Sequence, residues 1–158
     1  MTLEADLPLM LRLLVALLLA GLVGLERELN RTSVGLRTHA LVGVCTAAFV
    51  ILAELTVQAF QGTSPLLRFD PLAVLGATVS GISFLGAGAV IAGSTTERRQ
   101  SLTSAASILG TAAIGLCCGL AHYPLAATLT GVILLILHGF RWVEVHLLGT
   151  RRAPPPRE

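Results

Sequence analysis

The sequence predicts an all-α, multi-pass integral membrane protein with five transmembrane helices, and three observations support this class. Of the 158 residues, 54% are hydrophobic and only 13% are charged, and the mean hydropathy of +0.80 is far above that of a soluble domain. The charges fall in a few short clusters, whereas a soluble helical bundle needs a polar face along every helix. Five apolar stretches approach or exceed the length of about 20 residues that crosses a bilayer: 7–25, 38–60, 71–93, 102–121 and 124–147.

The first stretch, 7–25, is expected to remain in the mature protein. A cleaved secretory signal begins with positive charge, but the leading residues here include Glu4 and Asp6. The small residues Ala20 and Gly21 run on into further apolar sequence instead of ending at a cleavage site. We therefore interpret this stretch as a transmembrane helix.

A polar segment, GLERELNRTSVGLRTHALVG at 24–43, joins the first two stretches. Because Glu26 closes one helix and Arg37 opens the next, an ion pair between them is geometrically easy, and an exposed pair contributes ~0–1 kcal/mol. Alternatively, Glu26 and Glu28 are oxygen ligands for a hard cation such as Mg²⁺, or the segment is a proton-linked switch in which His39 titrates. The candidate functional cluster is Glu26, Arg27, Glu28, Arg37, Thr38 and His39.

Two charged residues, Arg12 and Glu54, lie inside the first two spans. Arg12 is a few residues from the start of the first span and Glu54 a few residues from the end of the second, so both lie near the same side of the predicted membrane. Ionisable groups within a span are costly and are usually paired or turned toward a polar interior. We predict an ion pair between them, with extension of each side chain to the membrane interface as the alternative.

The third stretch is rich in small residues, GATVSGISFLGAGAVIAG at 76–93. Small residues let helix backbones approach closely in lipid, so the expected role of these positions is helix packing. The alternative is a substrate pathway lined by exposed backbone. The glycines singled out here are Gly81, Gly86 and Gly88.

The fourth stretch opens with SLTSAASILGTAAIG at 101–115 and carries hydroxyl side chains along one helical face. Hydroxyls in a membrane helix usually bond the carbonyl four residues back or a neighbouring helix. A ligand or ion path is the alternative. The stripe consists of Thr103, Ser104, Ser107 and Thr111.

The fifth stretch begins at Pro124, which suits the first turn of a helix. Arginines gather after the first and third spans and in the C-terminal tail RRAPPPRE. Positive charge marks the cytoplasmic side, so we expect the N-terminus outside and the C-terminus in the cytoplasm. Residues 1–148 are expected to form one transmembrane domain, and 149–158 a disordered cytoplasmic tail rich in arginine and proline.

Several function classes are disfavoured by what the sequence lacks. It has no Gly-x-Ser-x-Gly turn, phosphate-binding loop or His-Glu-x-x-His, and its fourth-stretch serines have no obvious base at a matched position, so we do not expect an enzyme. The positive-inside bias explains the arginines, so no nucleic-acid partner is expected. No cofactor is expected either, except that Mg²⁺ binding at Glu26 and Glu28 stays open.

Four blocks of the sequence resemble the MgtC/SapB family of bacterial membrane proteins in order and spacing, and the resemblance covers residues 8 to about 145, nearly the whole chain. They are GLERE at 24–28, GLRTHALVG at 35–43, SGISFLGAGAVI at 80–91 and SLTSAASI at 101–108. The chain departs from the family in the fourth block, where Ser101 stands before Leu102 and Thr103 although many members have glycine. The better-known virulence members continue into a soluble C-terminal domain, whereas this sequence ends after the tail RRAPPPRE, so it resembles a short form of the family.

The resemblance implies a multi-pass protein of the bacterial inner membrane that serves adaptation to low magnesium and, in some pathogens, survival inside host cells. It favours a protein that binds or modulates other membrane machinery, such as the proton-driven ATP synthase. A transporter or channel for a divalent cation is the alternative, and a structural assembly subunit is a third class. The Gly-rich helix faces favour a homo-oligomer in the lipid bilayer.

Overall fold

The structure, a computed structural model, describes residues 3–60, 70–92 and 98–146. In these ranges the chain forms five helices, which confirms the predicted all-α class: α1 (Leu3–Leu29), α2 (Leu36–Phe60), α3 (Pro71–Ala92), α4 (Arg98–Gly119) and α5 (Tyr123–His146). By length and composition, α1 to α4 can each cross a membrane. The apolar part of α5 is shorter and covers Tyr123–Gly139. The predicted tail, 149–158, lies outside the described residues.

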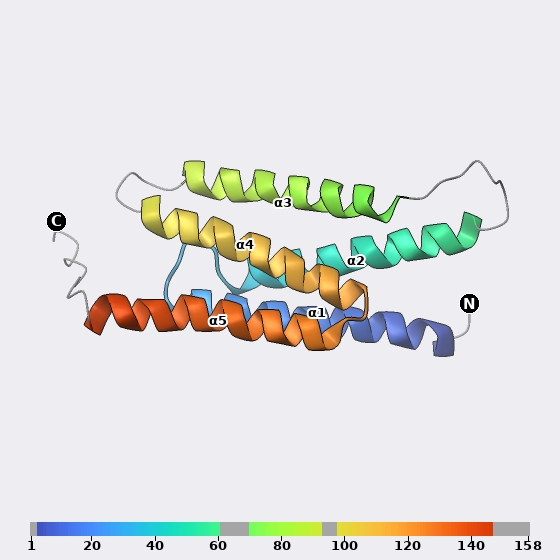
Figure 1. The fold of residues 1–158 in the computed structure, drawn as a ribbon, viewed down its shortest axis with the longest axis horizontal. Helices are drawn as coiled ribbons and strands as arrows, with labels where there is room; N and C mark the ends of the chain where they lie inside the picture. Colours follow the sequence, from blue (N-terminus) through green and yellow to red (C-terminus); the bar gives the residue numbers. More distant parts are fainter. Residues whose placement is uncertain (1–2, 61–69, 93–97, 147–158) are drawn as a thin grey trace.

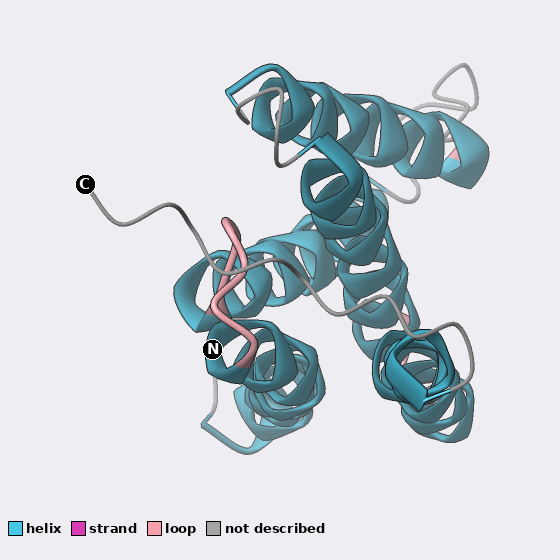
Figure 2. Cartoon of the chain, turned by 90° about the vertical axis from the view of Figure 1, so that its left-hand side faces the viewer, coloured by secondary structure: helices cyan, strands magenta, loops and turns pink. Residues whose placement is uncertain are grey.

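Helix α4 lies at the centre of the arrangement and contacts each of the other four helices (Figure 1). Helices α1 and α2 form an antiparallel hairpin behind it, and α4 runs in the same direction as α2 (Figure 1). In the end-on view, α3 lies on the outside of this group (Figure 2). The central unit is therefore α1, α2 and α4, with α3 and α5 on its flanks.

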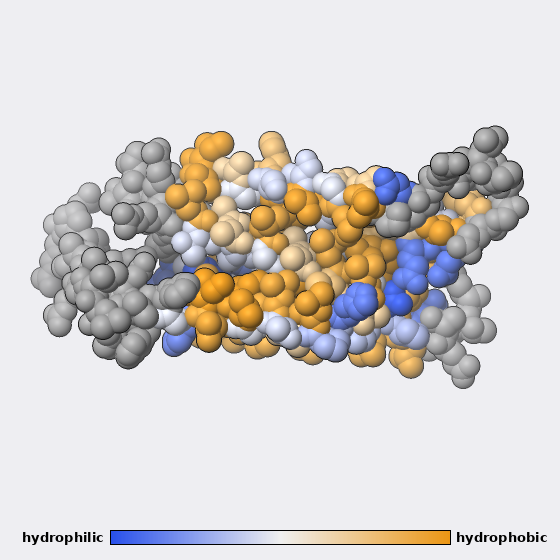
Figure 3. All heavy atoms as spheres, in the orientation of Figure 1, coloured by the Kyte–Doolittle hydropathy of each residue, from blue (hydrophilic) through white to orange (hydrophobic). Residues whose placement is uncertain are grey.

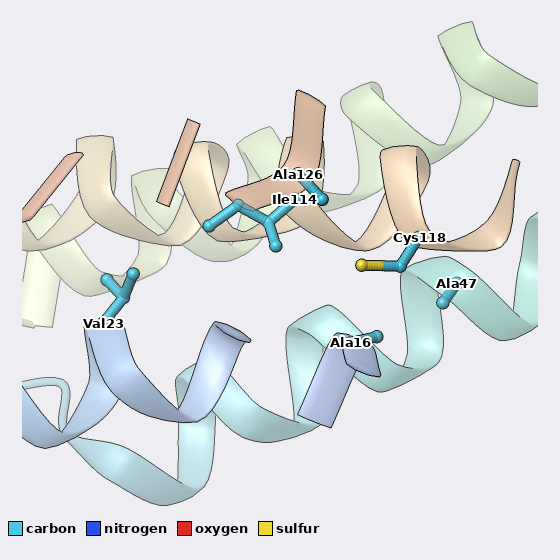
Figure 4. Close-up of a cluster of buried hydrophobic side chains, with 6 residues drawn as sticks. All are labelled: Ala16, Val23, Ala47, Ile114, Cys118 and Ala126. Atoms are coloured by element: carbon cyan, nitrogen blue, oxygen red, sulfur yellow. The ribbon is translucent and has the colours of Figure 1, made fainter. Parts of the chain in front are cut away.

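Small residues bring the helix backbones of the central unit close together. In lipid the hydrophobic effect gives helices no reason to associate, so their contact depends on close van der Waals packing. A Cβ added at Gly43 would overlap the Ala20 side chain, and one added at Gly115 would overlap the Gly43 carbonyl. Figure 4 shows a buried apolar cluster to which α5 also contributes, and it consists of Ala16, Val23, Ala47, Ile114, Cys118 and Ala126.

Helix α3 packs on α4 and, less extensively, on α2. Most of its surface is exposed, including Phe84 at 80% and Ile91 at 83%. Open apolar grooves flank it, one of about 260 Å³ against α4 and one of about 400 Å³ against α2. Apolar residues also cover the middle of the face in Figure 3, as expected for a surface in contact with lipid.

Local hydrogen bonds end α1 and α4 in the same way. The Thr32 N–H donates to the Arg27 carbonyl at 3.2 Å, and the His122 N–H donates to the Cys117 carbonyl at 2.8 Å. Each turn places one residue in the left-handed region, Arg31 at φ 51° and Ala121 at φ 58°. Glycine is the usual residue at this position, because a side chain there costs about 1–2 kcal/mol.

Candidate functional site

The polar cluster lies where the end of α1, the connection 30–35 and the beginnings of α2 and α4 meet. Arg27, in the last turn of α1, is only 6% exposed. Its Nη2 donates to the Ser104 hydroxyl of α4 at 3.2 Å, and the Ser33 hydroxyl donates to the same oxygen at 3.4 Å. A buried guanidinium thus joins α1 to α4.

His39 joins α2 to α4 within the same cluster, and its side chain is fully buried. Its Nδ1 lies 2.8 Å from the Gly35 carbonyl oxygen, and its Nε2 lies 3.0 Å from the Ser107 hydroxyl. The Ser107 hydroxyl is also 2.8 Å from the Ser104 carbonyl oxygen. These contacts bring the histidine and both serines into one hydrogen-bonded group with Arg27.

Two glycines allow the segments to approach this closely. A Cβ added at Gly24 of α1 would lie 2.8 Å from the Leu36 Cα and 2.9 Å from the His39 Cβ. A Cβ added at Gly35 would overlap the Glu28 carboxylate. That carboxylate accepts a hydrogen bond from the Leu36 N–H at 3.0 Å and so satisfies a free donor in the first turn of α2.

The expected ion pair between Glu26 and Arg37 does not form, and this interpretation is wrong. Asn30 donates to the Glu26 carboxylate, and the other carboxylate oxygen lies 3.9 Å from Nη1 of Arg27. Arg37 and the neighbouring Thr38 are exposed on the first turn of α2. The cluster therefore has a buried part, Arg27, His39, Ser104 and Ser107, and an exposed face, Arg37 and Thr38.

The hydroxyl stripe of α4 is divided by burial. Ser104, Ser107 and Thr111 are buried, and the Thr111 hydroxyl donates to the Ser107 carbonyl at 2.9 Å. Thr103 is exposed. An ideal helix turns about 100° per residue, so Thr103 lies at the edge of the face that its three neighbours share.

The glycines of α3 do not join the cluster. Gly86 packs against α4, where an added Cβ would lie 3.6 Å from the Ala105 Cβ. At Gly81 and Gly88 an added Cβ would meet no atom of the described chain within 4 Å. The polar cluster therefore faces the hydroxyls of α4 and not the small residues of α3.

The sequence reasoning missed the base beside the α4 serines. His39 lies 3.0 Å from Ser107 and is oriented by the Gly35 carbonyl, which is the geometry of a nucleophile and its general base. Both residues were already candidates, because His39 belongs to the predicted functional cluster and Ser107 to the predicted hydroxyl stripe, but the sequence did not indicate that they meet. Ser107 is only 4% exposed, however, so the arrangement suits hydrogen bonding and proton exchange better than attack on a substrate.

The ion pair predicted between Arg12 and Glu54 is confirmed, at the opposite end of α1. Nη1 of Arg12 lies 2.5 Å from the Glu54 carboxylate and donates to the Gly119 carbonyl at 3.0 Å. This contact joins α1 to both α2 and the last turn of α4. Among the residues that the structure describes, no three histidine, cysteine, aspartate or glutamate side chains gather in a way that could hold a metal ion.

Comparison with known proteins identifies the fold family. The model of the MgtC family matches residues 13–146. The chain is 39% identical over 127 residues to the protein MgtC of Salmonella typhimurium strain LT2, covering 80% of this chain and 50% of that protein. It is 32% identical over 141 residues to the putative magnesium transporter YhiD of Escherichia coli K12, covering 88% and 63%.

An uncharacterized protein of Haemophilus influenzae is 35% identical over 125 residues, covering 79% of this chain and 52% of that protein. The chain thus matches between half and two thirds of the length of these relatives. No solved structure matches it. The apolar helices and the bacterial relatives make it a multi-pass bacterial membrane protein, and the extent of the match shows that the chain belongs to the MgtC family.

Proposed function

We propose that this protein serves magnesium homeostasis by binding another membrane protein and modulating it through the exposed face of the polar cluster. Family membership and the magnesium-related name of one relative support the process. One observation carries the binding role: the buried part of the cluster is hydrogen-bonded within the chain, whereas Arg37 and Thr38 are exposed beside it. The buried part holds the face in position, and the face meets the partner.

The chemistry of the exposed face indicates the kind of partner. Arginine presents several N–H donors in a planar fork that matches a carboxylate. The positive-inside rule favours a cytoplasmic location for this end of the helices. The expected partner surface is therefore an acidic patch of a membrane protein at its cytoplasmic boundary.

Recovery of membrane partners with the tagged protein tests this proposal. Arg37→Ala removes the exposed guanidinium without touching the buried contacts, so we expect the helices to remain folded and the partner to be lost. Gln58→Ala is the matched control, because Gln58 is also exposed on α2 but lies near its other end. Equal partner recovery with Arg37→Ala and wild type would contradict the proposal.

Divalent-cation transport is the second candidate, and one observation favours it. The Oε2 atom of Glu26 is buried and accepts no hydrogen bond within the described chain, and a carboxylate oxygen is a ligand that Mg²⁺ prefers. Against this, the backbone contact of Gly43 with Gly115 leaves no space between α2 and α4 in their middle. Magnesium flux into liposomes that hold only this protein, lost in Glu26→Gln, would favour transport; no flux would favour the modulator.

A further inference from the structure

The hydrogen atoms around His39 allow only two arrangements. A carbonyl oxygen accepts but cannot donate, so Nδ1 must carry a proton in order to bond the Gly35 carbonyl at 2.8 Å. Nε2 faces the Ser107 hydroxyl at 3.0 Å, and that hydroxyl has one proton to donate. The same hydroxyl lies 2.8 Å from the Ser104 carbonyl oxygen, so the ring and this carbonyl compete for one proton.

The charge of the ring decides this competition. In a neutral ring Nε2 has no proton, so the Ser107 hydroxyl donates to it and leaves the Ser104 carbonyl. In a charged ring Nε2 donates to the Ser107 oxygen, and the Ser107 proton is free to bond the Ser104 carbonyl. The neutral state thus makes two hydrogen bonds among these groups, and the charged state makes three.

We propose that His39 is a buried proton-binding site. A proton taken from water binds Nε2, raises the charge of the ring by one and turns the Ser107 hydroxyl from the ring to the Ser104 carbonyl. The extra bond lies within α4, from the Ser107 hydroxyl to the Ser104 carbonyl, and the bond between the ring and Ser107 that joins α2 to α4 reverses its direction. The Ser104 side chain also accepts a hydrogen bond from Arg27 of α1, so protonation changes the hydrogen bonds at the residue where the three central helices meet.

The charged groups around the ring come mainly from α1. The charges of Arg27 and Glu26 both act on the His39 ring, and because they have opposite signs their electrostatic effects partly offset each other. Glu28 lies beside Gly35. On its own helix Arg37 is exposed, and Arg31 is exposed in the connection before it. Helix α4 contributes the neutral hydroxyls of Ser104 and Ser107, so the proton enters a site without a dedicated carboxylate partner.

Nitrogen-15 NMR of histidine-labelled protein in nanodiscs tests the proposal directly. At high pH we expect the neutral His39 ring to carry its proton on Nδ1, although free histidine in water favours Nε2. On acidification to about pH 5, within the range where histidine titrates, we expect a second proton at Nε2. His39→Gln assigns the signal by removing it, and His122→Gln, His138→Gln and His146→Gln assign it by elimination if that variant does not fold.

Two further variants decide whether Ser107 takes part. Ser107→Ala is expected to shift the midpoint of the His39 titration, because it removes two of the three hydrogen bonds of the charged state and one of the two bonds of the neutral state. Ser83→Ala is the control, since the Ser83 hydroxyl is exposed on α3 and bonds the Val79 carbonyl of its own helix. A neutral ring protonated on Nε2, no titration down to about pH 5, or an unchanged midpoint in Ser107→Ala would each overturn the proposal. None of these results depends on the partner that the protein binds.

Discussion

The two ends of the α1–α4 contact are built on the same plan with different chemistry. At each end an arginine of α1 reaches α4: Arg27 binds Ser104 and Arg12 binds Gly119, so the two contacts are fifteen residues apart on both helices (12 to 27 and 104 to 119). The Arg27 end is buried, and the described contacts of Arg27 include the Ser104 hydroxyl and the Glu26 carboxylate. The Arg12 end is an ion pair whose side chains are 17% and 42% exposed.

This difference separates a structural contact from a candidate site. A partly exposed ion pair near a helix end is screened wherever water reaches it, and it fixes little beyond the distance between two helices. The buried guanidinium lies in a hydrogen-bonded group that includes side chains of α2 and α4, so a change there alters several helices together. We therefore propose that the Arg27 end is functional and that the Arg12 end anchors the helices.

The largest effect is expected at the buried arginine. Arg27→Ala leaves the Glu26 carboxylate without its counter-charge and removes one of the donors to the Ser104 hydroxyl, so we expect a loss of about 3 kcal/mol in the free energy of unfolding. Unfolding in mixed micelles measures it. Arg27→Lys keeps the charge but not the planar fork of donors, so its loss in stability should be smaller than that of Arg27→Ala. A smaller loss for Arg27→Ala than for Arg12→Ala would contradict the proposed difference between the two ends.

The middle of the contact should respond next. Gly115→Ala places a Cβ on the Gly43 carbonyl, and backbone cannot move aside easily, so a loss of about 1–3 kcal/mol is expected. Gly81→Ala is the control, because nothing in the described chain lies within 4 Å of its added Cβ. If both variants unfold at the same denaturant concentration as wild type, the two ends are not joined by a tightly packed seam.

A smaller loss is expected at the ion pair. Arg12→Ala removes the bonds to Glu54 and to the Gly119 carbonyl, and a partly exposed pair contributes about 0.2–1 kcal/mol. Because salt screens such pairs, the loss should shrink at high ionic strength. A loss that is large and independent of salt would mean that the Arg12 end is as buried in the membrane as the Arg27 end.

A small effect of opposite sign, a gain in stability, is expected at the turns that end the two helices. Ala121→Gly relieves the left-handed backbone after α4 and should stabilise the protein by about 1 kcal/mol. Arg31→Gly relieves the same strain after α1 but also removes a side chain that makes contacts of its own. We expect a smaller gain or a loss there, measured in the same unfolding assay; equal gains would show that the Arg31 side chain contributes nothing.

Much of the fold follows from the sequence, because hydropathy alone predicts five helices. The ion pair between Arg12 and Glu54 follows as well, because an unpaired charge inside a membrane span is costly. The membership of the cluster followed as far as His39 and Ser107, but their contact did not. A hydropathy pattern gives the length of a helix and not its rotation, so neither the Ser107 side chain facing the histidine nor the exposure of Thr103 could be predicted.

The glycines also show that sequence does not specify which surfaces of the helices meet. Gly24, Gly81 and Gly115 read alike in sequence, as small residues in apolar helices. Only Gly24 and Gly115 lie where another backbone approaches, while Gly81 is exposed. Which neighbour a small residue meets depends on the arrangement of all five helices, which no local pattern specifies.

Growth at limiting magnesium tests the central claim most directly. A bacterial strain lacking its own MgtC-family protein would be complemented with wild type, with Arg37→Ala at the Arg27 end or with Gln58→Ala at the Arg12 end, each present in the membrane in equal amount. We predict that wild type and Gln58→Ala restore growth and that Arg37→Ala does not. Equal growth with Arg37→Ala and wild type would contradict the assignment of function to the Arg27 end.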